Sequence, residues 1–519
     1  MPIKIHLDSI RTSLAKDRST GSNKREASNP KLKLLFATLA LFAAGFAAAR
    51  QVASWPNRLR YPGELDPVEG RVLADTEMLR QGLPVYTPAR PEKFNALIYG
   101  PLFYILGSRL INPQKPAYFP LRVVAMAGTL GLAAGFSVLA FWLTGSYLAA
   151  GLAPLIFLAY GFTTSFGVAV HSDSIALLLW YWGFLVAYRF RNSWGVLLAV
   201  PLMIMGGYYK AQFVAALLAV LLFLVLEKRF RQAAAFTALM VAGAVTLLLI
   251  FQFVTFRHQA FWLHSVTYNA IPFGLERVIP WVMFFGIIYG VPCLVALQFL
   301  RAYPNKLLAC YFGWSVVLPA LTIGKYGTSF NYSFELLLLV CPVFAAFLAK
   351  EIATPWRATL LLCLLGITLG VGGLFKAQND PQPVDFAEDR AVQTYLRDNF
   401  RPHTPALGVF TGDLLRAGLD VPITDIYQYT WLVRTGVLPE EGLLAQFRSR
   451  RFQVILLNQD FRSETDPYQQ DYMCVTEPLR QAIIQNYKLD ASFAFRLVDK
   501  RHYYAWVPRQ RAALELPGH

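Results

Sequence analysis

Five carboxylates lie close together early in the chain, in a half of the sequence where acids are otherwise scarce. Glu64, Asp66, Glu69, Asp75 and Glu77 fall within fourteen residues. A carboxylate held against a membrane surface can have a raised pKa and can act as a general base. We therefore predict a catalytic role for Glu64, Asp66 and Glu69. We expect Asp75 and Glu77 to lie on the solvated face of an amphipathic helix from 69 to 81.

A second group of polar residues adjoins apolar stretches further along the chain. Charges at such positions are costly unless they are paired or functional, although lysine and arginine can also extend towards lipid headgroups. We predict that this group binds substrate, with headgroup contact as the alternative for each cation. The residues are Lys210, Arg257, His258 and Lys325.

No metal site or cofactor is expected. His258 and His264 lie six residues apart in one loop, but no third ligand stands at a suitable spacing. The sequence also has no P-loop and no glycine-rich dinucleotide motif after a strand. Any catalysis is therefore predicted to use side chains alone.

The elements that must position these residues are apolar helices. Of the 519 residues, 55% are hydrophobic and 15% are charged, and a helix that crosses a bilayer needs about 20 apolar residues. We predict a polytopic α-helical membrane protein with about eleven spans. The predicted spans are residues 34–49, 120–143, 147–168, 174–189, 195–209, 211–226, 233–255, 280–299, 306–323, 332–349 and 357–375.

The connections between these spans differ in charge, which predicts their sides. Lysine and arginine gather in the connections 189–191, 227–232, 301–306 and 350–357, and such loops mark the cytoplasmic face. The N-terminus is then cytoplasmic. The opposite face of the inner membrane receives 51–119, 171–173, 256–279, 324–331 and the C-terminal region. The short apolar piece 97–110 is predicted to lie at the interface rather than to span.

Three regions follow from composition. Residues 1–31 are predicted to be a disordered cytoplasmic tail, 32–375 a transmembrane domain and 376–519 an extracytoplasmic α/β domain. In the last of these we predict a helix at 384–400, strands at 406–410 and 452–457, and a hairpin of 492–497 with 502–507. From 376 onward basic and acidic residues nearly balance, so the net charge of +16 belongs to the membrane half. That location favours lipid headgroups over nucleic acid as its partner.

Several motifs follow one another in a fixed order along the membrane half. They are Asp66 or Glu69 in the first loop, the sequences Met78-Leu-Arg-Gln-Gly82, Pro84-Val-Tyr86 and Tyr99-Gly-Pro-Leu-Phe-Tyr104, then His171-Ser-Asp173, and Gly324 to Glu335 with Asn331. Their order and types resemble the GT-C superfamily of membrane glycosyltransferases, the bacterial relatives of protein O-mannosyltransferases and lipid A aminoarabinose transferases. One departure is the adjacent Asp-Glu pair of that family, which Pro67 and Val68 separate here.

The resemblance implies transfer of a sugar from a polyprenyl-phosphate donor to an acceptor lipid, glycan or protein on the outer face. A general base, which could be Asp66, Glu69 or Glu64, would deprotonate the acceptor as it attacks with inversion. Cations would stabilise the departing lipid phosphate. By the same resemblance, His171, Asp173, Tyr99, Asn331 and Glu335 join the predicted substrate-binding residues.

Two other functions remain open at the level of sequence. A transporter or flippase of lipid-linked sugars would favour acids and broken helices at mid-membrane depth and inverted repeats, and neither is found. A non-catalytic envelope scaffold would depend on residues 376–519 and would tolerate loss of the acidic loop.

Overall fold

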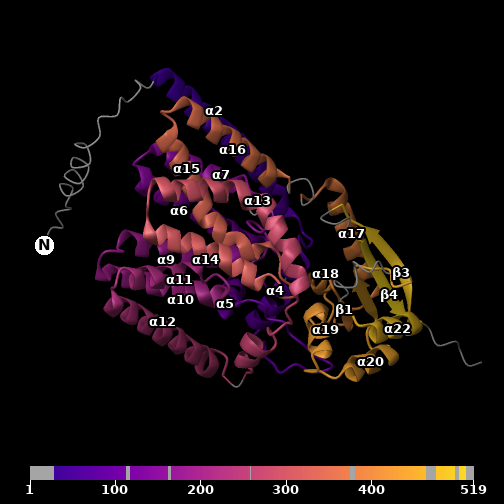
Figure 1. The fold of residues 1–519 in the computed structure, drawn as a ribbon. Helices are drawn as coiled ribbons and strands as arrows, with labels where there is room; N and C mark the ends of the chain where they lie inside the picture. Colours follow the sequence, from indigo (N-terminus) through magenta and orange to yellow (C-terminus); the bar gives the residue numbers. More distant parts are fainter. Residues whose placement is uncertain are drawn as a thin grey trace, which may run out of the picture.

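A bundle of apolar helices and a smaller domain with a sheet make up the fold (Figure 1). The computed structural model describes residues 29–112, 117–161, 165–257, 259–374, 380–462, 475–496 and 502–509. Most of the tail predicted for 1–31 and the predicted boundary at 375–376 lie outside these ranges. At the end of that tail, Pro30 already begins the first described helix, which Asn29 caps.

The membrane half consists of helices that begin and end close to the predicted spans. They are α2 (Pro30–Val52), α6 (Phe119–Thr144), α7 (Tyr147–Leu158), α9 (Asp173–Arg189), η1 (Trp194–Ala199), α10 (Val200–Tyr209), α11 (Ala215–Leu226), α12 (Phe230–Ile250), η2 (Phe251–Thr255), η3 (Leu263–Thr267), α13 (Leu275–Ala302), α14 (Lys306–Thr322), η4 (Phe330–Ser333), α15 (Phe334–Glu351) and α16 (Pro355–Gly373).

Six helical segments in the described ranges are long and apolar enough to cross a membrane. Among them the segment Phe330–Glu351, which contains α15, is the most buried, and it forms the centre of the bundle. Shorter apolar helices at 147–158, 194–209, 215–226 and 306–322 complete the bundle. The polytopic helical fold is thus confirmed, whereas the number of about eleven spans stays a prediction.

One predicted span is much shorter than expected. The apolar run 147–168 is helical in α7 only to Leu158. Further on, side chains of other elements bind the backbone carbonyls of Ser165 and Gly167 and the amide of Val170. These bonds satisfy backbone groups of the segment that leads to His171.

The first loop contains α3 (Trp55–Arg60), α4 (Pro67–Arg80) and α5 (Pro101–Leu110). The prediction that α4 has a solvated face with Asp75 and Glu77 is wrong. Asp75 is fully buried and Glu77 is 8% exposed. The reason is that α18 and the loop after it, both from the C-terminal region, cover α4, and a sequence pattern cannot reveal a cover that comes from so far along the chain.

The C-terminal domain has a four-stranded mixed sheet with helices. Its elements are α17 (Pro383–Asn399), β1 (Ala406–Gly408), α18 (Thr411–Arg416), α19 (Ile426–Arg434), α20 (Glu440–Arg448), β2 (Val454–Leu457), α22 (Glu477–Asn486), β3 (Tyr487–Ala494) and β4 (His502–Pro508). The strand order is β1-β2-β4-β3. β1 and β2 are parallel, because helices connect them, while β3 and β4 form the predicted antiparallel hairpin.

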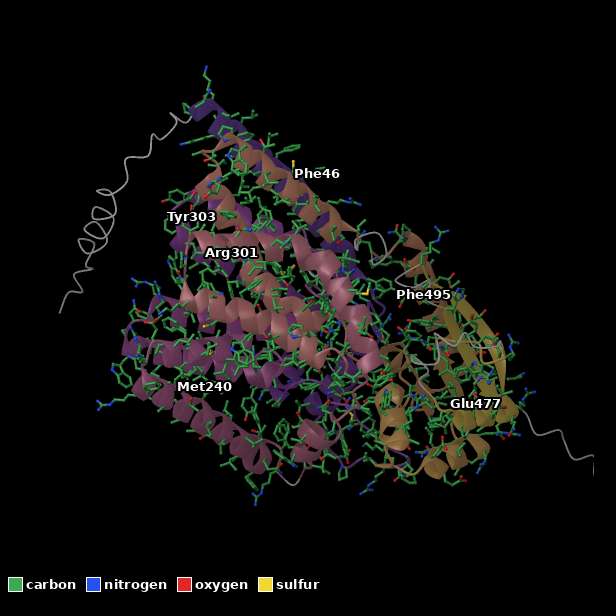
Figure 2. All side chains as sticks on the ribbon, in the orientation of Figure 1. Phe46, Met240, Arg301, Tyr303, Glu477 and Phe495 are labelled. Atoms are coloured by element: carbon green, nitrogen blue, oxygen red, sulfur yellow. The ribbon has the colours of Figure 1, made fainter. Side chains whose placement is uncertain are left out.

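The domain contacts one end of the bundle (Figure 1). Arg301 and Tyr303, from the connection predicted to be cytoplasmic, lie at the opposite end, away from Glu477 and Phe495 of the domain (Figure 2). This separation agrees with the predicted sides, although which end faces outward stays a prediction.

Two glycines bring the bundle and the domain together. A Cβ atom at Gly412 of α18 would lie 1.7 Å from Tyr118 Oη and 2.8 Å from Gly70 Cα of α4. The amide of Gly412 donates to Glu64 Oε1 at 2.7 Å. The contact therefore requires that residue 412 has no side chain.

We predict that Gly412→Ala lowers the stability of the protein by about 1–3 kcal/mol, the usual cost of overpacking. The measurement is the thermal unfolding midpoint of the detergent-purified protein. Gly286→Ala in α13 is the control, because an added Cβ meets no atom within 4 Å there. Equal midpoints for the two variants would contradict the close contact.

Candidate active site

Asp66 and His171 face each other at the end of the bundle next to the C-terminal domain. Asp66 caps α4, where its Oδ1 accepts from Val68 N at 2.8 Å. The same oxygen lies 3.8 Å from His171 Nε2, and the Asp66 side chain is 40% exposed. His171 is nearly buried, and its Nε2 makes no hydrogen bond among the described residues. Asp66 is thus a carboxylate that solvent can reach.

Asp173, at the first turn of α9, is held by a cation and an amide. Lys210 Nζ donates to both of its carboxylate oxygens, at 2.9 and 2.8 Å. Asn331 Nδ2 donates to Oδ1 at 3.0 Å. Asp173 is fully buried, and the N-terminus of α9 adds a favourable dipole. Residues from three elements are therefore joined at one carboxylate.

Tyr99 connects these two groups. Its hydroxyl lies 2.6 Å from His171 Nδ1, and its ring faces Lys210 Nζ at 5.0 Å. His171 Nδ1 is also 3.8 Å from Asp173 Oδ2. Asp66, His171, Asp173, Lys210, Asn331 and Tyr99, all predicted from sequence, thus form one network.

Glu69 is buried beside this network and is fully paired. It accepts from Arg122 Nε and Nη2 at 3.0 and 2.6 Å. It also accepts from the backbone amides of Leu65 and Val170, both at 2.7 Å. Glu64 is buried too, and it binds Gly412 of the C-terminal domain. Of the three acids predicted to be catalytic, Asp66 alone is substantially exposed.

Four of the predicted binding residues are not seen in the network. Lys325 donates to the carbonyl of Asn269 at 2.6 Å, and burial lowers its pKa. Glu335 accepts from Ala215 N at the start of α11. Arg257 is exposed, and His258 lies outside the described residues.

A metal site was not expected from sequence, and no group of three or more His, Cys, Asp or Glu side chains suited to a metal occurs in the ranges that the structure describes. Lys210 pairs with Asp173, and Arg122 pairs with Glu69. The arrangement can hold an anion, orient a hydroxyl and accept a proton.

Comparison with known proteins gives structural but no sequence matches. No protein-family model matches the chain, and no curated protein matches it significantly. The crystal structure of ArnT from Cupriavidus metallidurans in the apo state matches with a TM-score of 0.57 and 10% identity, over 89% of this chain and 97% of that one. The chain has the fold of ArnT.

Two further solved structures are similar. ArnT bound to undecaprenyl phosphate matches with a TM-score of 0.53 and 12% identity, over 91% of this chain and 97% of that one. An oligosaccharyltransferase from Archaeoglobus fulgidus has a TM-score of 0.49 and 11% identity, over 92% and 75% of the two chains. The predicted GT-C-like fold, with a helical membrane domain followed by a domain with a sheet, is confirmed by the ArnT match.

Two arginines of this ArnT-like fold were missed by sequence reasoning. Arg122 lies inside an apolar run and carries no motif, but an arginine within a predicted span is itself a signal of a buried partner. Arg71 lies on α4, and its Nη1 pairs with Asp425 Oδ2 of the C-terminal domain at 2.7 Å. No local pattern indicates that pair, because its members are 354 residues apart.

Asp75 stabilises the chain just before Tyr99. Its Oδ2 accepts from Leu97 N at 3.2 Å, and its Oδ1 contacts Thr424 Oγ1 at 3.3 Å. Leu97 has a φ of 45°, a left-handed conformation that costs energy for a residue with a side chain. Burial raises the pKa of Asp75 to about 7.

We predict that Asp75 makes the folded state less stable as pH rises. The unfolded carboxyl ionises near its ordinary pKa, whereas the folded one keeps its proton until about pH 7. Between pH 5 and 7 this group should lower the free energy of unfolding by about 1.4 kcal/mol for each pH unit. Asp75→Asn should remove that part of the slope. Thermal unfolding at pH 5, 6, 7 and 8 checks it, and an identical slope in both proteins would contradict it.

Proposed function

We propose that the protein is a membrane glycosyltransferase, which moves a sugar from a polyprenyl-phosphate donor to an acceptor lipid, glycan or protein. The chain has the fold of ArnT, and one of the matching ArnT structures is bound to undecaprenyl phosphate. Both findings support this class of function. The observation that carries the proposal is the network of Asp66, His171, Asp173 and Lys210, which combines an exposed carboxylate with a cation at the end of an apolar bundle.

Asp66 is proposed as the general base. It would take the proton of the acceptor hydroxyl while the oxygen attacks the anomeric carbon, with inversion. Among the three candidate acids its exposure supports this role, because a base must reach its substrate. In the tautomer that accepts from Tyr99 at Nδ1, His171 presents a protonated Nε2 towards Asp66 and helps to orient it.

Lys210 is proposed to stabilise the departing lipid phosphate. Asp173 takes two of the three N–H donors of its ammonium group. The third N–H would donate to a phosphate oxygen, and the positive charge of the ammonium group would stabilise the negative charge that develops on the leaving phosphate. Asp173 and Asn331 then fix the position of Lys210, while Arg257, His258, Lys325 and Glu335 stay proposed contacts for donor or acceptor.

The reaction would take place on the outer face of the cytoplasmic membrane. The space outside the cytoplasmic membrane has no pool of nucleotide sugars, so a lipid-linked donor at the interface is a suitable substrate. The step needs no redox cofactor, and we propose no resident metal. A flippase of the same lipid would instead move the donor between leaflets without consuming it.

We predict that Asp66→Asn lowers sugar transfer by about 10²–10⁴-fold while insertion into the membrane is unchanged. The measurement is lipid and glycan profiling of a strain without the protein, then of the same strain with each variant. Loss of function should remove one sugar from the envelope and accumulate a polyprenyl-phosphate sugar.

The control is Glu92→Gln, which changes an exposed carboxylate in the same loop and should restore the missing sugar. Restoration by Asp66→Asn at wild-type level would disprove the catalytic assignment. A donor that is redistributed between leaflets but never consumed would indicate a transporter.

A further inference from the structure

Arg122 is a fully buried arginine that binds several parts of the first loop at once. Its guanidinium donates to the carbonyls of Arg58, Tyr61 and Gly63, and to the carboxylate of Glu69. The Gly63 and Glu69 contacts from Nη2 measure 2.7 and 2.6 Å. The planar guanidinium has five donors in a fixed geometry. One side chain of α6 therefore fixes the path of the loop that leads to Asp66.

Glu69 binds the backbone next to both Asp66 and His171. Its Oε2 accepts from Leu65 N, and its Oε1 accepts from Val170 N, each at 2.7 Å. Leu65 directly precedes Asp66, and Val170 directly precedes His171. A single carboxylate thus binds the two backbone amides next to the two facing side chains, although they lie in segments about a hundred residues apart.

We propose that Glu69 and Arg122 form a positioning pair, which sets the distance between Asp66 and His171. The proposal rests on the proposed function, because it assigns Glu69 a supporting role in that reaction instead of the role of base. Arg122 supplies the positive charge that pairs with the buried Glu69, and Glu69 holds the segments of Leu65 and Val170 next to each other.

The contacts of Glu69 argue against a role as the base. Each oxygen already accepts from the arginine and from a backbone amide, and the side chain is fully buried. A proton acceptor must reach the substrate, and Asp66 is the acid in this loop that can do so. Glu69→Gln preserves the size of the side chain, and Arg122→Lys preserves the positive charge while it reduces the number of donors from five to three.

The first measurement is independent of activity. Hydrogen exchange of the detergent-purified protein, read on peptides that cover 61–68 and 166–172, should be about tenfold faster or more in Glu69→Gln and in Arg122→Lys. The control is Glu351→Gln, which changes another buried carboxylate paired with an arginine, at the far end of α15. In Glu351→Gln the exchange of 61–68 and 166–172 should equal that of the wild type. Unchanged exchange in the two test variants would overturn the proposal.

The second measurement separates positioning from catalysis. With a polyprenyl-phosphate sugar extracted from the strain that lacks the protein, both test variants should lose about tenfold or more in kcat at nearly constant KM for the donor. The shape of the pH profile should be that of the wild type. A profile of Glu69→Gln that loses its acid limb would show that Glu69 is the base and would overturn the proposal. If the wild type does not turn over the lipid, the proposed function fails, while the exchange result still decides whether Glu69 orders the two segments.

Discussion

A charge buried among apolar helices must be matched by an opposite charge or by several hydrogen-bond donors, because it has lost its water. Two acids of the membrane half meet this requirement in different ways. Glu69 is paired with Arg122, and Asp173 with Lys210 and Asn331. Each solution joins two or more helices, so these pairings determine which helix ends meet at the candidate site.

Much of the fold could be predicted because hydropathy is a local property. Runs of apolar residues predicted most of the helices within a few residues, with the run 147–168 as an exception, and the strand-like run 502–507 predicted a strand. Residues of the candidate network could be predicted for a related reason. A charge such as Lys210 beside an apolar run is rare enough to attract attention without knowledge of its partner, and the motif that contains Asp173 was found by its resemblance to a known family.

The rest depends on contacts between distant segments. The sequence could not indicate that α4 is covered, because its pattern of acids looks the same whether water or α18 lies against it. It also could not distinguish Asp66 from Glu69 as the base. The proposal of Asp66 rests on Arg122, Leu65 and Val170, whose bonds occupy Glu69, and on the exposure of Asp66 itself.

The contact between Glu64 and Gly412 has a consequence for biosynthesis. The two residues are 348 positions apart, and chains are made at about 5–20 residues per second. The acidic loop is therefore synthesised roughly 20 to 70 seconds before α18 exists to bind it. Until then Glu64 lacks the bond from the Gly412 amide, and Asp75 lacks the bond from the Thr424 hydroxyl. A chain truncated before residue 412 lacks this contact, so the order of synthesis makes the first loop one of the last parts of the protein to be completed.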